Sequence, residues 1–268
     1  MMPAAAQRRL RELCVPAGAL AVWWRHVLVW RRLFWASIST NVFEPLLFLF
    51  AFGYGLGAII GTLGELPYLV FILPGMMAYS AMFAASFEST LSAYARFRMQ
   101  HTWDAMLATP LSLTDVLLGE ALWAITKAMI SSVCVLLVGW AWGGIPSPGG
   151  ALLAIPVLAI GAASFAAVGL AATAHARNWD FFNYVFTFWV TPMFIFSGVF
   201  FEVSRFPDAI EAVSWILPMT HLVAVVRPLT AGLPLALPNA LGHIAYLVVL
   251  ALGAFALARY RIGRRMFD

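Results

Sequence analysis

Six stretches of this 268-residue chain are apolar over the length that a helix needs to cross a lipid bilayer, and this pattern constrains the fold most strongly. The hydrocarbon core of a bilayer requires roughly 20 apolar residues per helix. Backbone polar groups find no water in that core, so each stretch must satisfy its own hydrogen bonds as a helix. The stretches cover about residues 38–60, 68–91, 121–143, 152–174, 184–201 and 240–258.

The composition agrees with a membrane protein. Hydrophobic residues make up 63% of the chain, charged residues only 10%, and the mean hydropathy is +0.88. A soluble domain of this length needs no such apolar excess. We therefore expect an all-α integral membrane protein with six transmembrane helices in one membrane domain. The absence of a visible internal repeat argues against a secondary transporter built from inverted halves.

The arginines are distributed unevenly between the two sides of the predicted membrane domain. Six precede the first span, two lie between spans two and three, one follows span four and four follow span six, whereas only Arg205 and Arg227 lie on the opposite side. Cytoplasmic loops carry the excess of positive charge, so both termini are expected in the cytoplasm. The same bias accounts for the pI of 9.4, and we expect no nucleic-acid partner.

Residues 1–37 are predicted to form a cytoplasmic arm that includes an amphipathic interface helix over about residues 16–36. Trp23, Trp24 and Trp30 alternate there with Arg25 and Arg31. Tryptophan beside arginine is typical of a helix lying at the level of the lipid headgroups. The helix is either a surface anchor or a connecting element that transmits motion to the first span. Residues 38–268 then form the six-span domain.

The region 202–236 is too apolar for an ordinary loop and too interrupted for a continuous span. It contains Pro207, Pro218 and Pro228. Asp208 and Glu211 favour the start of a short helix directly after Pro207. Irregular backbone is tolerated at membrane depth when protein covers it. We therefore predict a re-entrant helical hairpin on the external side.

The polar segment 92–120 lies between two apolar spans, and its pattern is typical of a segment that contacts a partner protein. Three apolar residues recur at helical spacing within it, and the Thr109-Pro110 pair favours a helix end. Such a helix is able to insert its apolar face into a groove on a partner protein. The alternative is a helix resting on the lipid headgroups. The candidate contact residues are Arg96, Arg98, Gln100, Trp103, Asp104, Met106, Leu107 and Pro110.

Three charged residues fall inside the predicted spans, namely Glu44, Glu88 and Lys127. A charge at the bilayer centre costs about 3 kcal/mol on the lenient insertion scale, so each should face protein, water or an opposite charge. Glu88 and Lys127 lie at comparable depth on adjacent spans and are able to pair. Such a pair would either fix the register of the helices or act as a conformational latch.

Motifs of catalysis and metal binding are missing from the sequence. It contains no HExxH, no Walker A loop and no GxSxG elbow. The five histidines are scattered without ligand spacing, and Cys14 and Cys134 have no metal-ligand company. We expect no catalytic, cofactor-binding or metal-binding residue in this chain.

The segment HTWDAMLATPLSLTDVLLGEALW resembles the signature region of type-2 ABC exporter permeases. In that family a short coupling helix precedes a TPLS sequence and a Gly-Glu pair entering the third span. FEPLLFLFAFGYGLG, PYLVFILPGMMAYSAMFAASFES and TPMFIFSGVFF resemble the NodJ branch of the family more closely still. The likeness runs in order from about Trp23 to the C-terminus.

The resemblance implies a homodimeric permease served by a separate ATP-binding subunit of NodI type, which would bind the ATP and Mg. The implied cargo is a lipid-linked or amphipathic molecule resembling a lipooligosaccharide. NodJ proteins of nodulating bacteria are associated with lipochitin oligosaccharide, but the branch is broader than nodulation. The segment 92–120 would then be the coupling loop that contacts the ATP-binding subunit.

The family's arrangement places spans two and five near the dimer axis and so nominates residues of the substrate pathway. These candidates are Met76, Met82, Phe83, Phe194 and Phe196. Methionine and aromatic side chains form adaptable surfaces that suit varied apolar cargo. Ordinary helix packing is the alternative for each of them, and a lateral groove is the alternative route.

Two other functions remain open at this stage. An integral-membrane enzyme acting on a lipid or isoprenoid would need polar residues converging near one membrane face, and no such cluster is apparent in the sequence. A non-exporting, permease-like assembly factor, for example for cytochrome maturation, is the other alternative.

Overall fold

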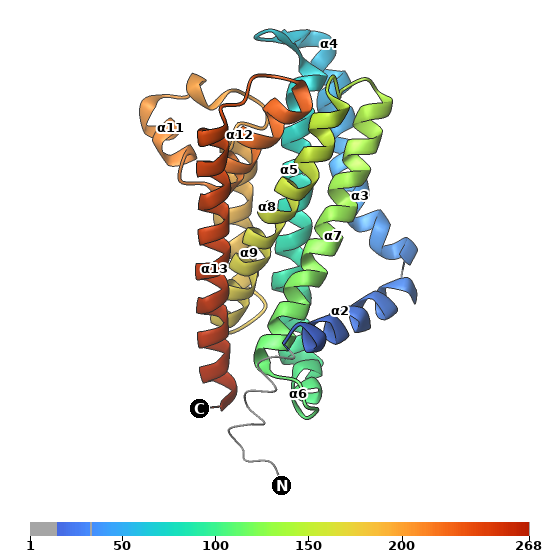
Figure 1. Ribbon diagram of the computed structural model, residues 1–268, viewed down its shortest axis with the longest axis vertical. Helices are drawn as coiled ribbons and strands as arrows, with labels where there is room; N and C mark the ends of the chain where they lie inside the picture. Colours follow the sequence, from blue (N-terminus) through green and yellow to red (C-terminus); the bar gives the residue numbers. More distant parts are fainter. Residues whose placement is uncertain (1–14, 33, 268) are drawn as a thin grey trace.

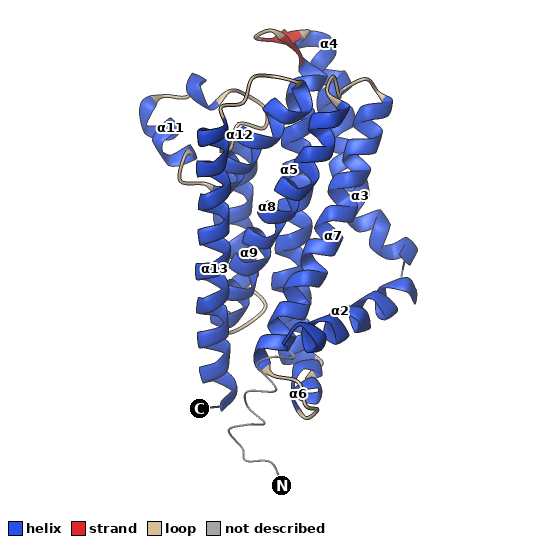
Figure 2. Ribbon diagram, in the orientation of Figure 1, coloured by secondary structure: helices blue, strands red, loops and turns tan. Residues whose placement is uncertain are grey.

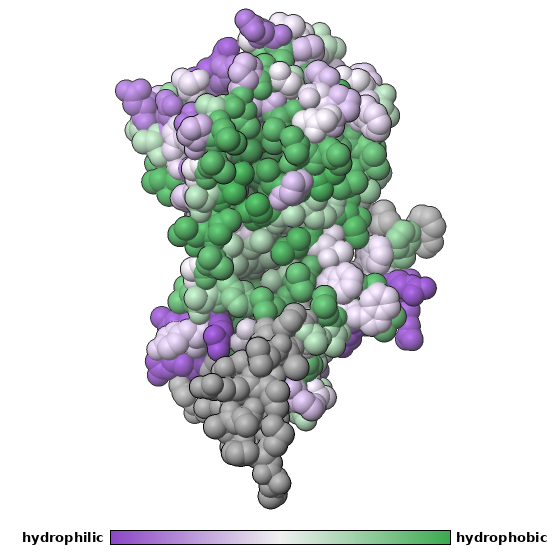
Figure 3. Space-filling view, in the orientation of Figure 1, coloured by the Kyte–Doolittle hydropathy of each residue, from purple (hydrophilic) through white to green (hydrophobic). Residues whose placement is uncertain are grey.

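The computed structural model describes residues 15–32 and 34–267, and most of these residues are helical (Figures 1 and 2). On the face that Figure 3 shows, apolar side chains cover the middle of the molecule and hydrophilic side chains gather toward both ends. This arrangement confirms the expected all-α integral membrane fold. Five helices in the described part are long and apolar enough to cross a bilayer: Phe43–Ile60, Tyr68–Met99, Leu113–Ala141, Pro148–His175 and Leu237–Met266.

The first described helix, α2 (Val15–Arg32), lies across one end of the bundle (Figure 1). One side buries Ala19, Val22 and His26 against the protein, whereas Trp24 and Leu28 are half-exposed on another side. A helix with one side buried against protein and apolar residues exposed on another side is consistent with the predicted interface helix. Residues 1–14 of the predicted arm, including Cys14, lie outside the described residues.

The helix that contains the first span begins earlier than the sequence suggested, although its membrane-length apolar part is Phe43–Ile60. It comprises α3 (Phe34–Phe50), the π-helical η1 (Ala51–Leu56) and α4 (Gly57–Ile60), whereas the predicted start was residue 38. The ring of Phe34 packs edge-on against Trp30, with 4.9 Å between centroids, so the apolar contact that begins this helix reaches back to α2. A minimal hairpin follows, in which β1 (Thr62–Leu63) pairs with β2 (Leu66–Pro67).

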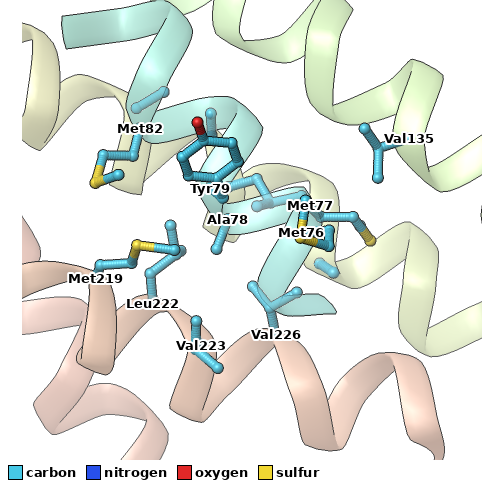
Figure 4. Close-up of a cluster of buried hydrophobic side chains, with 14 of the residues drawn as sticks. Met76, Met77, Ala78, Tyr79, Met82, Val135, Met219, Leu222, Val223 and Val226 are labelled. Atoms are coloured by element: carbon cyan, nitrogen blue, oxygen red, sulfur yellow. The ribbon is translucent and has the colours of Figure 1, made fainter. Parts of the chain in front are cut away.

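The second span forms the centre of the bundle. It consists of α5 (Tyr68–Phe87) and two π-helical segments, η2 (Glu88–Ser92) and η3 (Ala95–Met99). Its helix is apolar around its whole circumference, as expected of a helix that protein covers on every side. Figure 4 shows Met76, Met77 and Met82 in one buried cluster, with Met219, Leu222 and Val226 on one side and Val135 on another.

The third span also begins earlier than predicted. After the short α6 (Thr102–Leu107), α7 (Leu113–Ala141) starts at Leu113 rather than at residue 121. Ser112 Oγ accepts a hydrogen bond from the backbone N–H of Asp115, and Asp115 Oδ2 accepts one from the N–H of Ser112. This reciprocal capping box starts the helix inside the polar segment. The loop predicted over 92–120 is therefore mostly helical.

The remaining spans follow the predicted order with shifted ends. Helix α8 (Pro148–His175) is the fourth, and α13 (Leu237–Phe267) is the last. The fifth is a shorter apolar helix, Phe181–Phe196, divided into α9 (Phe181–Val185), η4 (Phe186–Val190) and α10 (Thr191–Phe196). It ends before the predicted residue 201 because Gly198 turns the chain with a φ of +75°.

The predicted pair of short helices at 202–236 is present in the structure. After the single turn η5 (Val203–Arg205), α11 (Asp208–Ser214) and α12 (Pro218–Ala231) are bent by 86° relative to each other. The half-buried Arg227 ties this pair to the centre of the bundle. Its Nε donates to the carbonyl of Phe71 over 3.1 Å, and its guanidinium lies 3.8 Å from the centroid of the Phe71 ring.

The two ends of the bundle carry different elements (Figure 1). Helices α2 and α6 and the end of α13 lie together at one end, whereas α4 and α11 lie at the other. The arginine-rich segments belong to the first end, which is the one that the charge bias predicts to be cytoplasmic. It is called the cytoplasmic end below.

Candidate functional site

Helices α2 and α7 make unusually close contact at the cytoplasmic end. A Cβ atom at Gly119 would lie 2.5 Å from Cβ of Val22, and one at Gly18 would lie 2.6 Å from Oδ1 of Asp115. Neither distance is compatible with a side chain at these positions unless something shifts. The two glycines therefore let the interface helix lie directly on the start of the third span.

Beside this contact, Arg96 bridges two buried carboxylates. Its Nη1 lies 2.8 Å from Oε1 of Glu88, and its Nε donates to Oε1 of Glu120 over 3.0 Å. Both carboxylate side chains are almost completely withdrawn from solvent, and that of Arg96 is 13% exposed. A fork of guanidinium donors matches two carboxylates better than an ammonium group does. Arg96 thus joins the end of span two to the start of span three.

Glu88 has a second cationic partner. Lys127 Nζ lies 2.8 Å from Glu88 Oε2, so the structure forms the pair that the sequence suggested. The two carboxylate oxygens of Glu88 are divided between Arg96 and Lys127. Sequence reasoning missed this sharing, since it assigned Arg96 only to contact with a partner protein. The π-helical turn that begins at Glu88 is the kind of local irregularity that often marks functional sites.

Glu120 connects the spans to α6 and α2. Trp103 of α6 donates a hydrogen bond from Nε1 to Glu120 Oε1 over 2.8 Å. His26 of α2 lies with Nε2 3.3 Å from the same oxygen, without hydrogen-bond geometry, and its ring stacks on Trp123. One buried carboxylate therefore contacts three other elements.

These residues form one closed set, the cytoplasmic network, consisting of His26, Glu88, Arg96, Trp103, Glu120 and Lys127. Two carboxylates face two obligatory cations, so the charges balance when His26 is neutral. All four carboxylate oxygens are engaged by a cation or an N–H group. No cluster of polar residues near one membrane face was apparent in the sequence, whereas the structure brings these six together. Because no carboxylate oxygen is left over, the geometry suits mechanical connection rather than acid–base chemistry.

Helix α6 is oriented differently from the prediction. From the sequence, the apolar face formed by Trp103, Met106 and Leu107 was predicted to contact a partner protein or the lipid headgroups. In the structure, Trp103 is fully buried, Met106 is buried and Leu107 is half-buried, all against the chain's own helical bundle. The ring of Trp103 stacks on Phe97, with centroids 4.8 Å apart. The apolar face of α6 is therefore buried within the chain, because Phe97 and the neighbouring helices supply an apolar surface directly beside it.

The opposite face of α6 is the one left open. Asp104 and Ala105 are exposed there, and Asp104 Oδ2 lies 2.9 Å from His101 Nδ1. His101 has a left-handed backbone with a φ of +50°, the only positive φ among the non-glycine residues that the structure describes. Arg98, Gln100, Thr109 and Pro110 are exposed beside this face. Of the predicted contact residues, Arg98, Gln100, Asp104 and Pro110 thus remain accessible.

The predicted pathway residues separate into three environments. Met76 and Met82 are completely buried in the core between α5 and α12, so they are packing residues within one chain (Figure 4). Phe196 packs edge-on against Phe206 near the bent helical pair α11 and α12. Phe83 and Phe194 belong instead to a row of partly exposed aromatic rings.

This aromatic row runs between the first, second and fifth spans. The buried ring of Tyr79 is its centre, with ring centroids 4.0 Å from Phe194, 5.8 Å from Phe83 and 6.0 Å from Phe48. The Tyr79 hydroxyl donates to Glu44 Oε1 over 2.9 Å, which gives the predicted intramembrane charge a partner. Further rings of the row are Phe52, Phe87, Phe186 and Phe200.

Comparison with known proteins gives a consistent result. The family "ABC-2 type transporter" matches residues 18–231. "Nodulation protein J" of Sinorhizobium fredii is 37% identical over 256 residues, covering 94% of this chain and 95% of that protein. The protein of the same name from Rhizobium leguminosarum bv. viciae is 38% identical over 257 residues, covering 93% and 98%. The "Inner membrane transport permease YadH" of Escherichia coli K12 is 20% identical over 207 residues, covering 77% and 80%.

Proposed function

The chain belongs to the ABC-2 type transporter family, as a permease of the nodulation-protein-J type, and from this premise we propose that it is half of an ATP-driven exporter. A second copy of the chain completes the membrane part. A separate ATP-binding subunit, of NodI type, binds and hydrolyses ATP with Mg. The assembly lies in the bacterial inner membrane with both termini in the cytoplasm.

The hydrogen bond between Trp103 and Glu120 is the observation that carries the coupling role. Helix α6 presents its exposed face, with Asp104 and Ala105, away from the bundle. Its buried face is fixed through Trp103 to the network. A displacement of α6 by the ATP-binding subunit therefore reaches spans two and three through Glu120 and Arg96. It reaches the interface helix through the contact between Glu120 and His26.

We also assign the network a switching role. A buried, balanced set of charges is stable when complete and costly when one member is pulled away. Movement of α6 has to keep the set together or exchange its partners, so intermediate positions are disfavoured. A set with two stable arrangements would convert a displacement of α6 into a discrete change in helix packing. The adjoining cavity of about 300 Å³, lined in part by Arg25, Trp30 and Lys127, leaves room for the exchange.

The aromatic row supports an amphiphilic cargo. It is continuous between spans one, two and five, and its rings other than the buried Tyr79 are only partly covered. Aromatic rings give large apolar contact without demanding one ligand shape. Glu44 and Tyr79 add one polar point to this surface. A lipid-linked or lipooligosaccharide-like molecule combines acyl chains with polar groups and fits such a lining.

The experiment is reconstitution of the purified chain with its ATP-binding subunit in proteoliposomes. We expect ATP turnover to depend on the permease and a labelled lipooligosaccharide to become accessible on the opposite leaflet only with ATP and Mg. An ATP-binding subunit that neither associates with the chain nor responds to it would refute the proposal.

A further inference from the structure

A second cluster of charge lies at the cytoplasmic end, at a distance in sequence from the network. It surrounds a cavity of about 470 Å³ between the end of α8 and the last turns of α13. Arginines from the loop after α8 and from α13 converge on it. The lining residues are Ala174, His175, Arg177, Arg261, Arg264 and Arg265.

The arginines of this cavity are held close together despite their like charge. Arg261 and Arg265 are four residues apart on α13 and so share one face of the helix. Arg98 and Arg177 are near enough to Arg265 to repel it electrostatically. Within the described part of the chain, no aspartate or glutamate lines the cavity. A concave surface of one sign concentrates counter-ions of the other sign.

Hydrogen bonds to the backbone fix two sides of the cavity. Arg265 Nη1 donates to the carbonyl of Ala176 over 2.8 Å, so its guanidinium is anchored without being neutralised. The Tyr94 hydroxyl donates to the carbonyl of Arg177 over 3.2 Å and holds the loop after α8 in place. The site is thus positioned by the fold and does not depend on long, freely moving side chains alone.

The surroundings of the cavity match the boundary of a membrane. Trp179, in the same loop as Arg177, and Tyr260, beside Arg261, are both exposed. Tryptophan and tyrosine favour the level of the lipid headgroups. On α13, Leu252 and Leu257 are exposed on the turns that precede the arginines. The basic cavity therefore continues into an apolar helix surface.

We propose that this cavity binds the headgroup of an anionic phospholipid of the cytoplasmic leaflet. The phosphate would lie between Arg177, Arg261 and Arg265, with the acyl chains along the exposed face of α13. Basic pockets between transmembrane helices at this level are suited to anionic lipid headgroups. The lipid would also pin the last turns of α13 to the loop after α8.

The test measures binding of phosphatidylglycerol to the purified full chain in detergent, by native mass spectrometry and by lipid-dependent thermal stability. The variant is Arg177→Gln with Arg261→Gln, which leaves the backbone contact of Arg265 intact. Removing two interfacial arginines should weaken phosphatidylglycerol binding by about tenfold or more. Arg177→Lys with Arg261→Lys should retain most of the binding.

Arg259→Gln is the matched control, because this exposed arginine lies on α13 but does not line the cavity. It should bind phosphatidylglycerol as the unaltered chain does. Phosphatidylcholine should give no comparable stabilisation, and inorganic phosphate should not displace the lipid. Equal losses in variant and control would identify a diffuse basic surface and overturn the proposal.

Two further outcomes would also overturn the proposal. Displacement of the lipid by inorganic phosphate would identify a site for soluble anions. Unchanged lipid binding, together with weakened association of the ATP-binding subunit, would identify a protein contact.

Discussion

Trp103 on α6 and Glu120 on α7 share a hydrogen bond of 2.8 Å between Nε1 and Oε1, and both side chains are buried. The two residues belong to different elements, one a six-residue helix at the cytoplasmic end and the other a membrane span. The bond is therefore a direct mechanical tie between the proposed contact helix and the transmembrane bundle.

Trp103→Phe removes this tie while the phenyl ring can still stack on Phe97, and the smaller ring adds the cost of a small cavity in this completely buried site. A hydrogen bond to a charged group is worth about 1.5–3 kcal/mol, and the free energy of unfolding should fall by at least that amount. Permease-stimulated ATP turnover should fall, while basal turnover of the ATP-binding subunit should not. Trp179→Phe, at an exposed tryptophan, should change neither quantity; a matching loss there would contradict the assignment.

Lys127→Met and Glu88→Gln form a double-mutant cycle. Removing Lys127 alone should lower the free energy of unfolding by up to about 3 kcal/mol, less than for an isolated buried pair because Arg96 still faces Glu88. Adding Glu88→Gln should restore part of that loss, but not all, since Arg96 then loses a partner. Thermal unfolding of the four proteins gives the coupling energy. Strictly additive effects would show that the two residues do not interact.

Gly119→Ala should dislodge α2 from α7. The added Cβ would lie 2.5 Å from Cβ of Val22, and overpacking of this kind costs about 1–3 kcal/mol. Gly253→Ala is the matched control on α13, where an added Cβ would meet no atom within 4 Å. Thermal unfolding, with protease accessibility of α2 as a local readout, compares the two. Equal behaviour of the variants would refute the close contact.

Phe83→Ala with Phe194→Ala tests the aromatic row as a substrate surface. Export of a labelled amphiphile should fall by about tenfold, equivalent to about 1.4 kcal/mol in the activation barrier, with dimer assembly and basal ATP turnover retained. Phe188→Ala changes a 73% exposed ring on the same span outside the row and should leave export unchanged. A bulky substitution at Met82 would not test the route, because this completely buried residue lies in the core and a larger side chain there would disrupt the fold. Undiminished export in the double variant would exclude this row as the route.

Hydropathy was sufficient to predict the order of the spans and the helical pair at 202–236. Both depend on properties carried by single segments: apolar length, and prolines that interrupt it. The ends of the helices were predicted less well. Polar residues such as Arg96 and Glu120 look like loop residues in sequence, yet they continue the helices because each supplies the other's charge partner.

The cytoplasmic network could not be predicted from the sequence, because only some of its charged residues stand out from their surroundings. Glu88 and Lys127 were recognised because a charge inside an apolar span is conspicuous, whereas Arg96 and Glu120 lie in a polar segment where charges are ordinary. The orientation of α6 was missed because amphipathicity shows that one face becomes buried but does not show against what. Burial of Trp103 depends on Phe97 and Glu120 being brought beneath it by two other helices.

The most direct test of the account is ATP turnover by the ATP-binding subunit in the presence of an Ala105→Arg permease. Ala105 is exposed on the open face of α6, so the bulky charge should leave the fold and its melting temperature unchanged while abolishing permease-stimulated turnover and association. Ala17→Arg, which adds the same charge on the exposed part of α2, is the control. Full stimulation by the folded Ala105→Arg protein would contradict the central claim that α6 receives the push of the ATP-binding subunit.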